Sequence, residues 1–519
     1  MEAHSSKTSG VKALSNIMSL PSVAALPRRG SAIARNSLYN LIGQGIPLFA
    51  AFWAIPPLIH GLGADRFGVL TLAWVIVGYF SLFDLGLGRA LTQLVAQELS
   101  EGPRGNPLPV VRTGLVLMCV LGLLGSVVVM LIASTLVDAV LKIPASLKAE
   151  TLYAFYVLAA AIPIVVLTAG LAGVLSAFER FGVLNAIRGA MGTYAFVAPL
   201  AVLPFSRSLV LVTAVLVLGR LVAAGAHLLA TWRVMPRLAE RMVVERAAIR
   251  PLFRFGAWMS VTNVIGPLLV YLDRFVIGAV VSVAAVAYYA TPYEMVTKLL
   301  IVPAAILGVL FPAFASSYRH DHTRMVRLFA NGTKYVALLL FPVVLVVVAL
   351  APEGMGWWLG VDFSRYSAPV LRCLAIGIFM NSVAQVFATL VQGVGRPDLT
   401  AKLHALELPI YLPILFWSIH HYGIVGAAFA WTGRVGFDGV LLLVLSARVL
   451  KNPTVVRRIV TGLVGALVAL ALPLLIGPAA FRALVAGMVL IVFLVVSWSV
   501  ALGDEERSSI KARVALFFA

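Results

Sequence analysis

Two opposite charges stand side by side inside one apolar run of this sequence. The run VYLDRFVIG, residues 270–278, contains Asp273 and Arg274 among almost entirely apolar neighbours. Adjacent side chains on a helix project about 100° apart, so these two are not expected to pair with one another. Each should need a partner on another helix, or contact with water. In such a place a carboxylate can bind a proton or sodium ion, and arginine can hold a phosphate through two hydrogen bonds.

Other charges inside apolar runs extend this picture. We expect the arginines that have no separate acidic partner within a helical turn to line an aqueous passage and bind an anionic substrate; they are Arg220, Arg274 and Arg372. The carboxylates that are candidates for coupling transport to an ion gradient are Asp273, Glu294 and Glu407. The alternative is structural pairing between helices, and for each residue taken singly both interpretations are open.

Three further sets of charges are spaced so that they can neutralise each other on one helix. The expected structural pairs are Glu294 with Lys298, Arg434 with Asp438, and Asp84 with Arg89. A spacing of four residues puts both members of the first two pairs on one helical face. In FDLGLGRA, residues 83–90, the spacing is five, and the arginine lies near the membrane surface, where it can reach the headgroups.

These charges must be positioned by membrane helices. The chain has 519 residues, of which 61% are apolar and 12% charged, and its mean hydropathy is +1.00. Such a composition excludes a soluble domain and predicts an all-α polytopic membrane protein. About fourteen transmembrane helices are expected, at 38–60, 67–90, 108–137, 151–177, 182–205, 208–232, 252–280, 284–314, 328–351, 366–392, 398–419, 423–447, 457–477 and 481–502.

The net charge of +19 is explained by membrane topology and not by nucleic-acid binding. With the N-terminus in the cytoplasm, the cytoplasmic segments and the adjoining ends of the spans hold 28 basic residues, and the opposite side, counted in the same way, holds six. This excess supports an even number of spans and places both termini in the cytoplasm. The predicted location is therefore the cell inner membrane.

A weak internal repeat at an offset of about 215–220 residues indicates two related halves. For example, LSAFERFGVLNAI (175–187) matches LVQGVGRPDLTAK (390–402), and a proline-bearing helix follows each. Two pseudo-symmetric six-helix lobes of the same orientation are expected, with two appended helices. The predicted division is a flexible cytoplasmic leader 1–35, an N-terminal lobe 36–234, a basic connector 235–250, a C-terminal lobe 251–450, appended spans 451–503 and a cytoplasmic tail 504–519.

Several segments in order resemble the polysaccharide repeat-unit flippases of the multidrug/oligosaccharidyl-lipid/polysaccharide exporter superfamily. The segments are NSLYNLIGQGIPLFAAFWAIPPLIHGLGADRFGVLTLAW (36–74), FDLGLGRAL (83–91), YLDRFVIGAV (271–280), AVAYYATPYE (285–294) and ILGVLFPAFA (306–315). The resemblance implies a V-shaped pair of lobes with a central cavity and alternating access. It also implies a substrate, an oligosaccharide on a polyprenyl pyrophosphate, for O-antigen or exopolysaccharide synthesis, with polymerase and glycosyltransferase partners.

Other functions stay open at this point. A lipid II flippase and a multidrug antiporter of the same superfamily are two alternatives. An antiporter for cationic drugs should have a cavity lined by acids, whereas most of the unpaired intramembrane charges here are positive. A membrane polysaccharide polymerase or ligase is the alternative from another class. No catalytic triad, nucleotide loop or metal-ligand spacing occurs, so we expect a transporter with no cofactor and no metal, apart from a coupling H⁺ or Na⁺.

Overall fold

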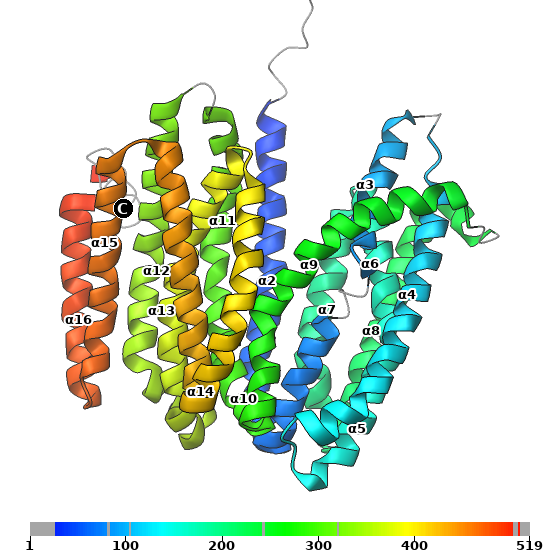
Figure 1. Cartoon of the computed structure of the whole chain (residues 1–519), viewed down its shortest axis with the longest axis horizontal. Coiled ribbons are helices and arrows are strands. Elements are labelled where there is room, and N and C mark those ends of the chain that lie inside the picture. Colours follow the sequence, from blue (N-terminus) through cyan, green and yellow to red (C-terminus); the bar gives the residue numbers. More distant parts are fainter. Residues whose placement is uncertain are drawn as a thin grey trace, which may run out of the picture.

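The computed structural model describes residues 26–79, 84–102, 105–240, 244–318, 321–501 and 507–508, and in these ranges the chain forms helices and no β-strand (Figure 1). The helices are α2 (Leu26–Tyr79), α3 (Leu87–Ser100), α4 (Leu108–Thr135), α5 (Ala145–Ala160), α6 (Ile162–Ala177), α7 (Phe181–Val202), α8 (Leu209–Val234), α9 (Arg246–Val280), α10 (Val283–Thr297), α11 (Ile301–Ser317), α12 (His322–Leu359), α13 (Val361–Gly393), α14 (Pro397–Leu450), α15 (Pro453–Ala471) and α16 (Ala479–Val496). Within those ranges, nine helical segments are long and apolar enough to cross a membrane.

The predicted fold class, an all-α polytopic membrane protein, is confirmed. Each of the fourteen predicted spans coincides with a helix, with part of one, or with two consecutive helices. The first two spans share α2, which is broken at Gly63 (φ 81°), and spans eleven and twelve share α14, which is broken at Gly423 (φ 59°). Glycine suits both breaks because it lacks the Cβ that disfavours positive φ.

Two boundaries differ from the prediction. The second span was expected to run from 67 to 90, but α2 ends at Tyr79 and α3 begins at Leu87. Leu85 and Gly86 between them both have positive φ, which a continuous helix cannot contain. In addition, α2 begins at Leu26, so residues 26–35 of the predicted flexible leader are helical, and residues 1–25 lie outside the described ranges.

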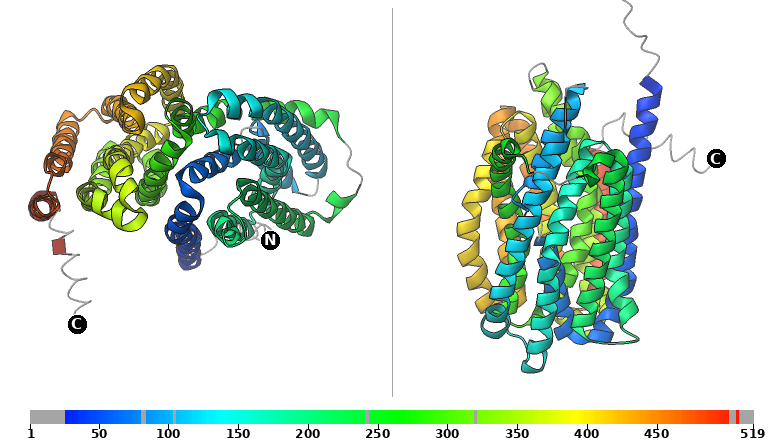
Figure 2. Two further views of the ribbon diagram at one scale, coloured as in Figure 1. Left: turned by 90° about the horizontal axis from the view of Figure 1, so that it is seen from below. Right: turned by 90° about the vertical axis from the view of Figure 1, so that its right-hand side faces the viewer.

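The helices gather into two groups (Figure 1). Helices α3 to α8 lie on one side and α10 to α14 on the other, while α15 and α16 flank α12 at the edge of the second group. Two helices contact both groups: α2 packs on α7 and α10, and α9 packs on α3 and α14. Figure 2 shows the same groups viewed along the helices. The residue limits of the lobes and of the tail stay predictions.

The two groups touch at one end of the molecule. The backbone N–H of Lys142 donates to the carbonyl of Gly278 at 2.9 Å, and the N–H of Val283 donates to the carbonyl of Lys142 at 3.4 Å. Gly68 of α2 lies so close to Val283 that a Cβ there would overlap its backbone carbonyl. In the predicted topology this end is the non-cytoplasmic one.

Candidate functional site

The intramembrane charges of α9, α10 and α14 form two clusters. The first, which we call the α9–α10 cluster, consists of Asp273 and Arg274 on α9, Glu294 on α10 and Lys298 directly after it. Arg274 lies 3.3 Å from a Glu294 oxygen and 3.7 Å from an Asp273 oxygen. Lys298 lies 3.4 Å from the second Glu294 oxygen, so the expected contact between these two residues is present.

Aromatic side chains complete the α9–α10 cluster. The Tyr289 hydroxyl donates to Asp273 at 2.5 Å. The Arg274 guanidinium lies over the rings of Tyr271 and Tyr293, at 4.9 and 4.5 Å from their centroids. Such cation–π contacts stabilise a guanidinium that has lost its water.

The expectation that Asp273 and Arg274 face an aqueous passage and cannot pair is wrong in this structure. The side chains of both residues are only 1% exposed, and they contact each other. The long arginine side chain folds back along its own helix, so that its Nη1 also donates to the carbonyl of Val270 at 3.3 Å. The angle of about 100° between adjacent residues fixes the directions of their Cα–Cβ bonds. It does not fix the position of the guanidinium at the end of a long, flexible side chain.

The second cluster, which we call the α14 cluster, joins the two halves of α14. Arg434 lies 3.2 Å from Glu407, and His404 lies 3.7 Å from Asp438. The break at Gly423 folds the halves antiparallel, so that residue 407 meets residue 434 and residue 404 meets residue 438.

The structural pair expected between Arg434 and Asp438 is therefore wrong. Their spacing of four residues permits a contact, but Arg434 turns to the more deeply buried Glu407 on the facing half of the helix. Glu407, which has no lysine or arginine within a helical turn in the sequence, thus has a basic partner on the facing half of α14. The sequence analysis did not identify His404, although this residue lies three positions before Glu407 and therefore on the same helical face.

The structural pair expected between Asp84 and Arg89 is also not formed. Asp84 instead accepts a hydrogen bond from the backbone N–H of Gly86 at 2.7 Å, in the turn that leads into α3. The helix break at Leu85 and Gly86 removes the continuous turn on which the expected pairing depended. Asp84 is therefore a turn residue held by backbone contacts.

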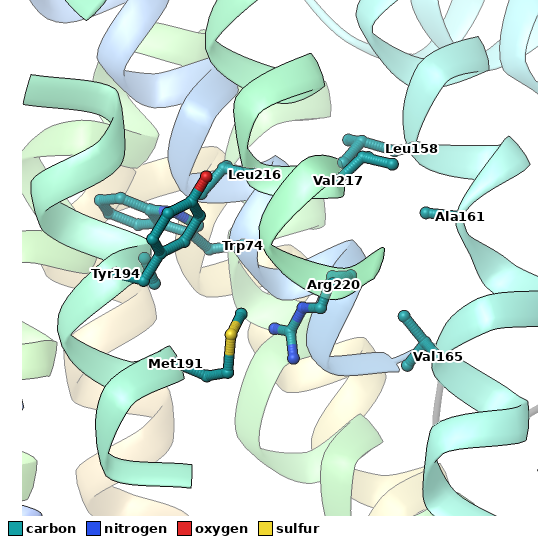
Figure 3. A pocket seen from close by; sticks show the side chains of 10 residues that line it. Trp74, Leu158, Ala161, Val165, Met191, Tyr194, Leu216, Val217 and Arg220 are labelled. Atoms are coloured by element: carbon teal, nitrogen blue, oxygen red, sulfur yellow. The ribbon is translucent and has the colours of Figure 1, made fainter. Parts of the chain in front are cut away.

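Arg220 of α8 lies inside the first group of helices. It borders a cavity of about 20 Å³, which is room for about one water molecule. Figure 3 shows its guanidinium pointing into the space between Met191 and Val165. Trp74 and Tyr194 form another wall of this cavity. In the described part of the chain, the guanidinium has no hydrogen-bonding side chain or carbonyl within reach.

Arg372 of α13 occupies a third location. Its Nε donates to the carbonyl of Val348 on α12 at 3.1 Å, while Nη2 is buried and meets no acceptor among the described residues. Nearby, Arg482 of α16 bonds to Glu353 and to the carbonyl of Ala349, a contact that the sequence reading did not anticipate. Arg220, Arg274 and Arg372 thus lie at three different helix contacts.

One set of residues has the composition of a metal site. His404, Glu407 and Asp438 each offer a ligand atom, and these atoms all lie within 4.8 Å of one another. Zinc bound to such ligands sits about 2.0–2.2 Å from each of them. This set is wider than a compact zinc site, and Arg434 stands beside it.

Comparison with known proteins gives a consistent result. A family described as polysaccharide biosynthesis protein matches residues 33–318. A Shigella flexneri protein named as an O-antigen transporter is 30% identical over 431 residues, covering 80% of this chain and 98% of its own length. The lipopolysaccharide biosynthesis protein WzxC of Escherichia coli K12 is 24% identical over 35% of this chain and 36% of its own.

Two solved structures share the fold at low sequence identity. An inward-facing multidrug resistance MATE family transporter superimposes with a TM-score of 0.65 at 13% identity, over 79% of this chain and 98% of its own. The lipid II flippase MurJ in an inward closed conformation superimposes with a TM-score of 0.64 at 11% identity, over 88% and 99%. The fold is that of multi-helix membrane transporters.

Proposed function

The chain belongs to the family of polysaccharide biosynthesis proteins, and from this premise we propose that it is a flippase for lipid-linked oligosaccharides. Its substrate would be an oligosaccharide repeat unit on a polyprenyl pyrophosphate, moved across the inner membrane with both termini in the cytoplasm. The observation that carries the proposal is the similarity to the Shigella flexneri protein over nearly the whole length of that protein.

Alternating access is the proposed mechanism, and the contact between the two groups of helices supports it. Besides the backbone bonds around Lys142, the Trp358 indole N–H donates to the Phe52 carbonyl at 3.0 Å, and the two rings stack with centroids 5.2 Å apart. These contacts lie at the end assigned to the outside. They and the packing of α2 on α10 join the two groups, so separating these contacts would let the outer end open.

Arg220 is the best placed of the three predicted substrate-binding arginines. Its guanidinium borders a cavity and is not occupied by an acid in the described residues, whereas Arg274 is committed to Asp273 and Glu294. An arginine that is free of protein partners can offer two parallel N–H groups to a pyrophosphate oxygen pair. The cavity beside it holds only about one water molecule, so binding requires the helices around it to separate.

Ion coupling is a second part of the proposal. A gradient of H⁺ or Na⁺ would drive transport through the intramembrane acids, because a buried carboxylate changes its interactions when it binds a cation. A lipid II flippase or a drug antiporter stays the alternative, since solved structures of both kinds share the fold. A transporter is favoured over a polymerase or ligase because the named relatives include an O-antigen transporter.

Deletion of the gene tests the proposal. Loss of the protein should leave lipid-linked repeat units on the cytoplasmic face, and surface polysaccharide should disappear until the wild-type gene is restored. The face is read by modification of the glycan with a reagent that cannot cross the membrane. Normal delivery of repeat units in the deletion strain, in a background without another flippase, would refute the function.

A further inference from the structure

Only one of the two buried charge clusters is short of positive charge. The α9–α10 cluster contains two acids and two bases, and so it is electrically balanced. Each Asp273 oxygen also accepts a hydrogen bond, one from the Tyr289 hydroxyl and one from the backbone N–H of Arg274. The charges of this cluster are therefore balanced, and both Asp273 oxygens accept hydrogen bonds.

The α14 cluster is different. Glu407 and Asp438 are 3% and 8% exposed, and among the residues that the structure describes Arg434 is the only permanently charged base in contact with Glu407. One oxygen of each carboxylate is buried and has no hydrogen-bond donor among the described residues. With a neutral His404, the cluster carries one uncompensated negative charge. A buried charge without a counter-charge is costly and is rarely kept without a function.

We propose that His404, Glu407 and Asp438 share one exchangeable proton, and that this site is where the transporter couples to the proton gradient. Their ligand atoms lie within 4.8 Å of one another, and one added proton makes the cluster neutral. The inference rests on the proposed function for the use of the proton, but the site itself can be tested without it. Two close acids with one proton behave as a single titrating unit.

His404 is the route to this proton from water. Its side chain is 43% exposed, and its Nε2 lies 3.7 Å from the buried Asp438 oxygen. A hydronium ion gives a proton to Nε2 and becomes water. The Nε2–H bond then breaks as an O–H bond forms on Asp438, and Glu407 shares that proton. Release runs through the same steps in reverse, and nothing is oxidised or reduced. Imidazole suits the task because it gains and loses a proton near neutral pH.

The proton can act on the shape of α14. Glu407 lies before the break at Gly423, whereas Arg434 and Asp438 lie after it. A neutral Glu407 loses most of its attraction for Arg434, which lies 3.2 Å away. Arg434 is then free to turn to Asp438, four residues along its own helical face. Protonation therefore decides whether the arginine ties the two halves of α14 together.

The groups around the α14 cluster do not offer another proton site. On α14 itself, the Tyr411 ring lies under Arg434, with its centroid 5.5 Å from the guanidinium carbon. From the other helices packed along this region, α9 contributes the ion-paired Asp273 and Arg274, α10 contributes Tyr293 against Trp431, and α13 contributes Cys373 against Thr432. Phenol and thiol groups are ordinarily neutral at pH 7.

A proton fits the site better than a metal ion does. Hard cations take about six to eight oxygen ligands, whereas this set has two carboxylates and an imidazole. Arg434 lies 3.2 Å from one of the carboxylates, where its positive charge would repel a bound cation.

Proton uptake by purified full-length protein in lipid nanodiscs tests the inference. Wild-type protein, taken from alkaline to mildly acidic pH, should bind about one more proton per chain than the double variant Glu407→Gln, Asp438→Asn. His404→Gln should leave this number unchanged but slow the uptake at least tenfold. Glu353→Gln, which removes a carboxylate paired with Arg482 outside both clusters, is the matched control and should take up protons like the wild type. If the double variant does not fold, Glu407→Gln alone is compared and should show the same loss.

Equal proton uptake by wild type and the folded Glu407 variant would overturn the inference. A stabilisation of the wild type by Na⁺ but not by K⁺, lost in the Glu407→Gln variant, would replace the proton with sodium and overturn it as well. Neither measurement uses a glycan substrate, so both are separate from the gene-deletion test. If the flippase assay fails but proton uptake is normal, the proposed function is refuted and the proton-binding site is still supported.

Discussion

Replacing Arg274 by methionine tests whether this arginine holds the fold together or binds substrate. Met fills a similar volume but leaves Asp273, which is 1% exposed, without a positive charge. Removing one partner of a buried ion pair costs about 3–5 kcal/mol. Glu294 contributes less to the loss, because its side chain is 39% exposed and it keeps Lys298 at 3.4 Å. We therefore expect a strongly destabilised protein.

The double variant Asp273→Asn, Arg274→Met separates the two roles. Removing both charges avoids the isolated carboxylate, so about half of the lost stability, roughly 2 kcal/mol, should return. Stability is read from denaturant unfolding of purified protein, and export is read from surface polysaccharide per folded molecule. If Arg274→Met has wild-type stability and still abolishes export, the structural interpretation is refuted and the arginine acts on substrate.

Three other variants test separate contacts. Arg220→Met should change the free energy of unfolding by no more than about 0.5 kcal/mol, as measured by denaturant unfolding. Export, measured as surface polysaccharide, should fall at least tenfold, because the lost hydrogen bonds between a charged group and the substrate contribute about 1.5–3 kcal/mol. Gly68→Val places side-chain atoms against the Val283 carbonyl, so spin-label distances between the two groups of helices should widen at the outer end and stability should fall by about 1–3 kcal/mol. Arg482→Met removes the ion pair with Glu353 and the bond to a carbonyl of α12, so denaturant unfolding should show a loss of about 2–3 kcal/mol, with export by the folded fraction unchanged.

Much of the fold can be predicted from the sequence because membrane insertion is governed by local composition. A helix that crosses the hydrocarbon core must satisfy its backbone hydrogen bonds internally, so long apolar runs report helices directly. The positions where helices break are harder to predict from the sequence. Gly423 separates two predicted spans as expected, but the break just before α3 depends on positive φ at Leu85, and leucine rarely adopts it.

Some contacts of the candidate site could likewise be predicted from the sequence and others could not. Sequence spacing correctly predicted Glu294 with Lys298, since both lie on one helical face and no stronger partner takes Lys298. The same rule was wrong for Arg434, because the folding back of α14 at Gly423 presents Glu407, a more deeply buried acid. Both acids are buried, so the contact between the two halves of α14, and not the spacing along one of them, determines which acid the arginine reaches.

The amino-acid sequence was enough to predict a polytopic helical membrane protein with charges inside its membrane helices. Which charges neutralise one another became clear only from the folded molecule. That choice depends on which helix faces come into contact and how much water remains between them, and neither is encoded by spacing along a single helix. The α14 cluster illustrates the reason: His404 and Asp438 are far apart in the chain, and they meet only because α14 folds back on itself.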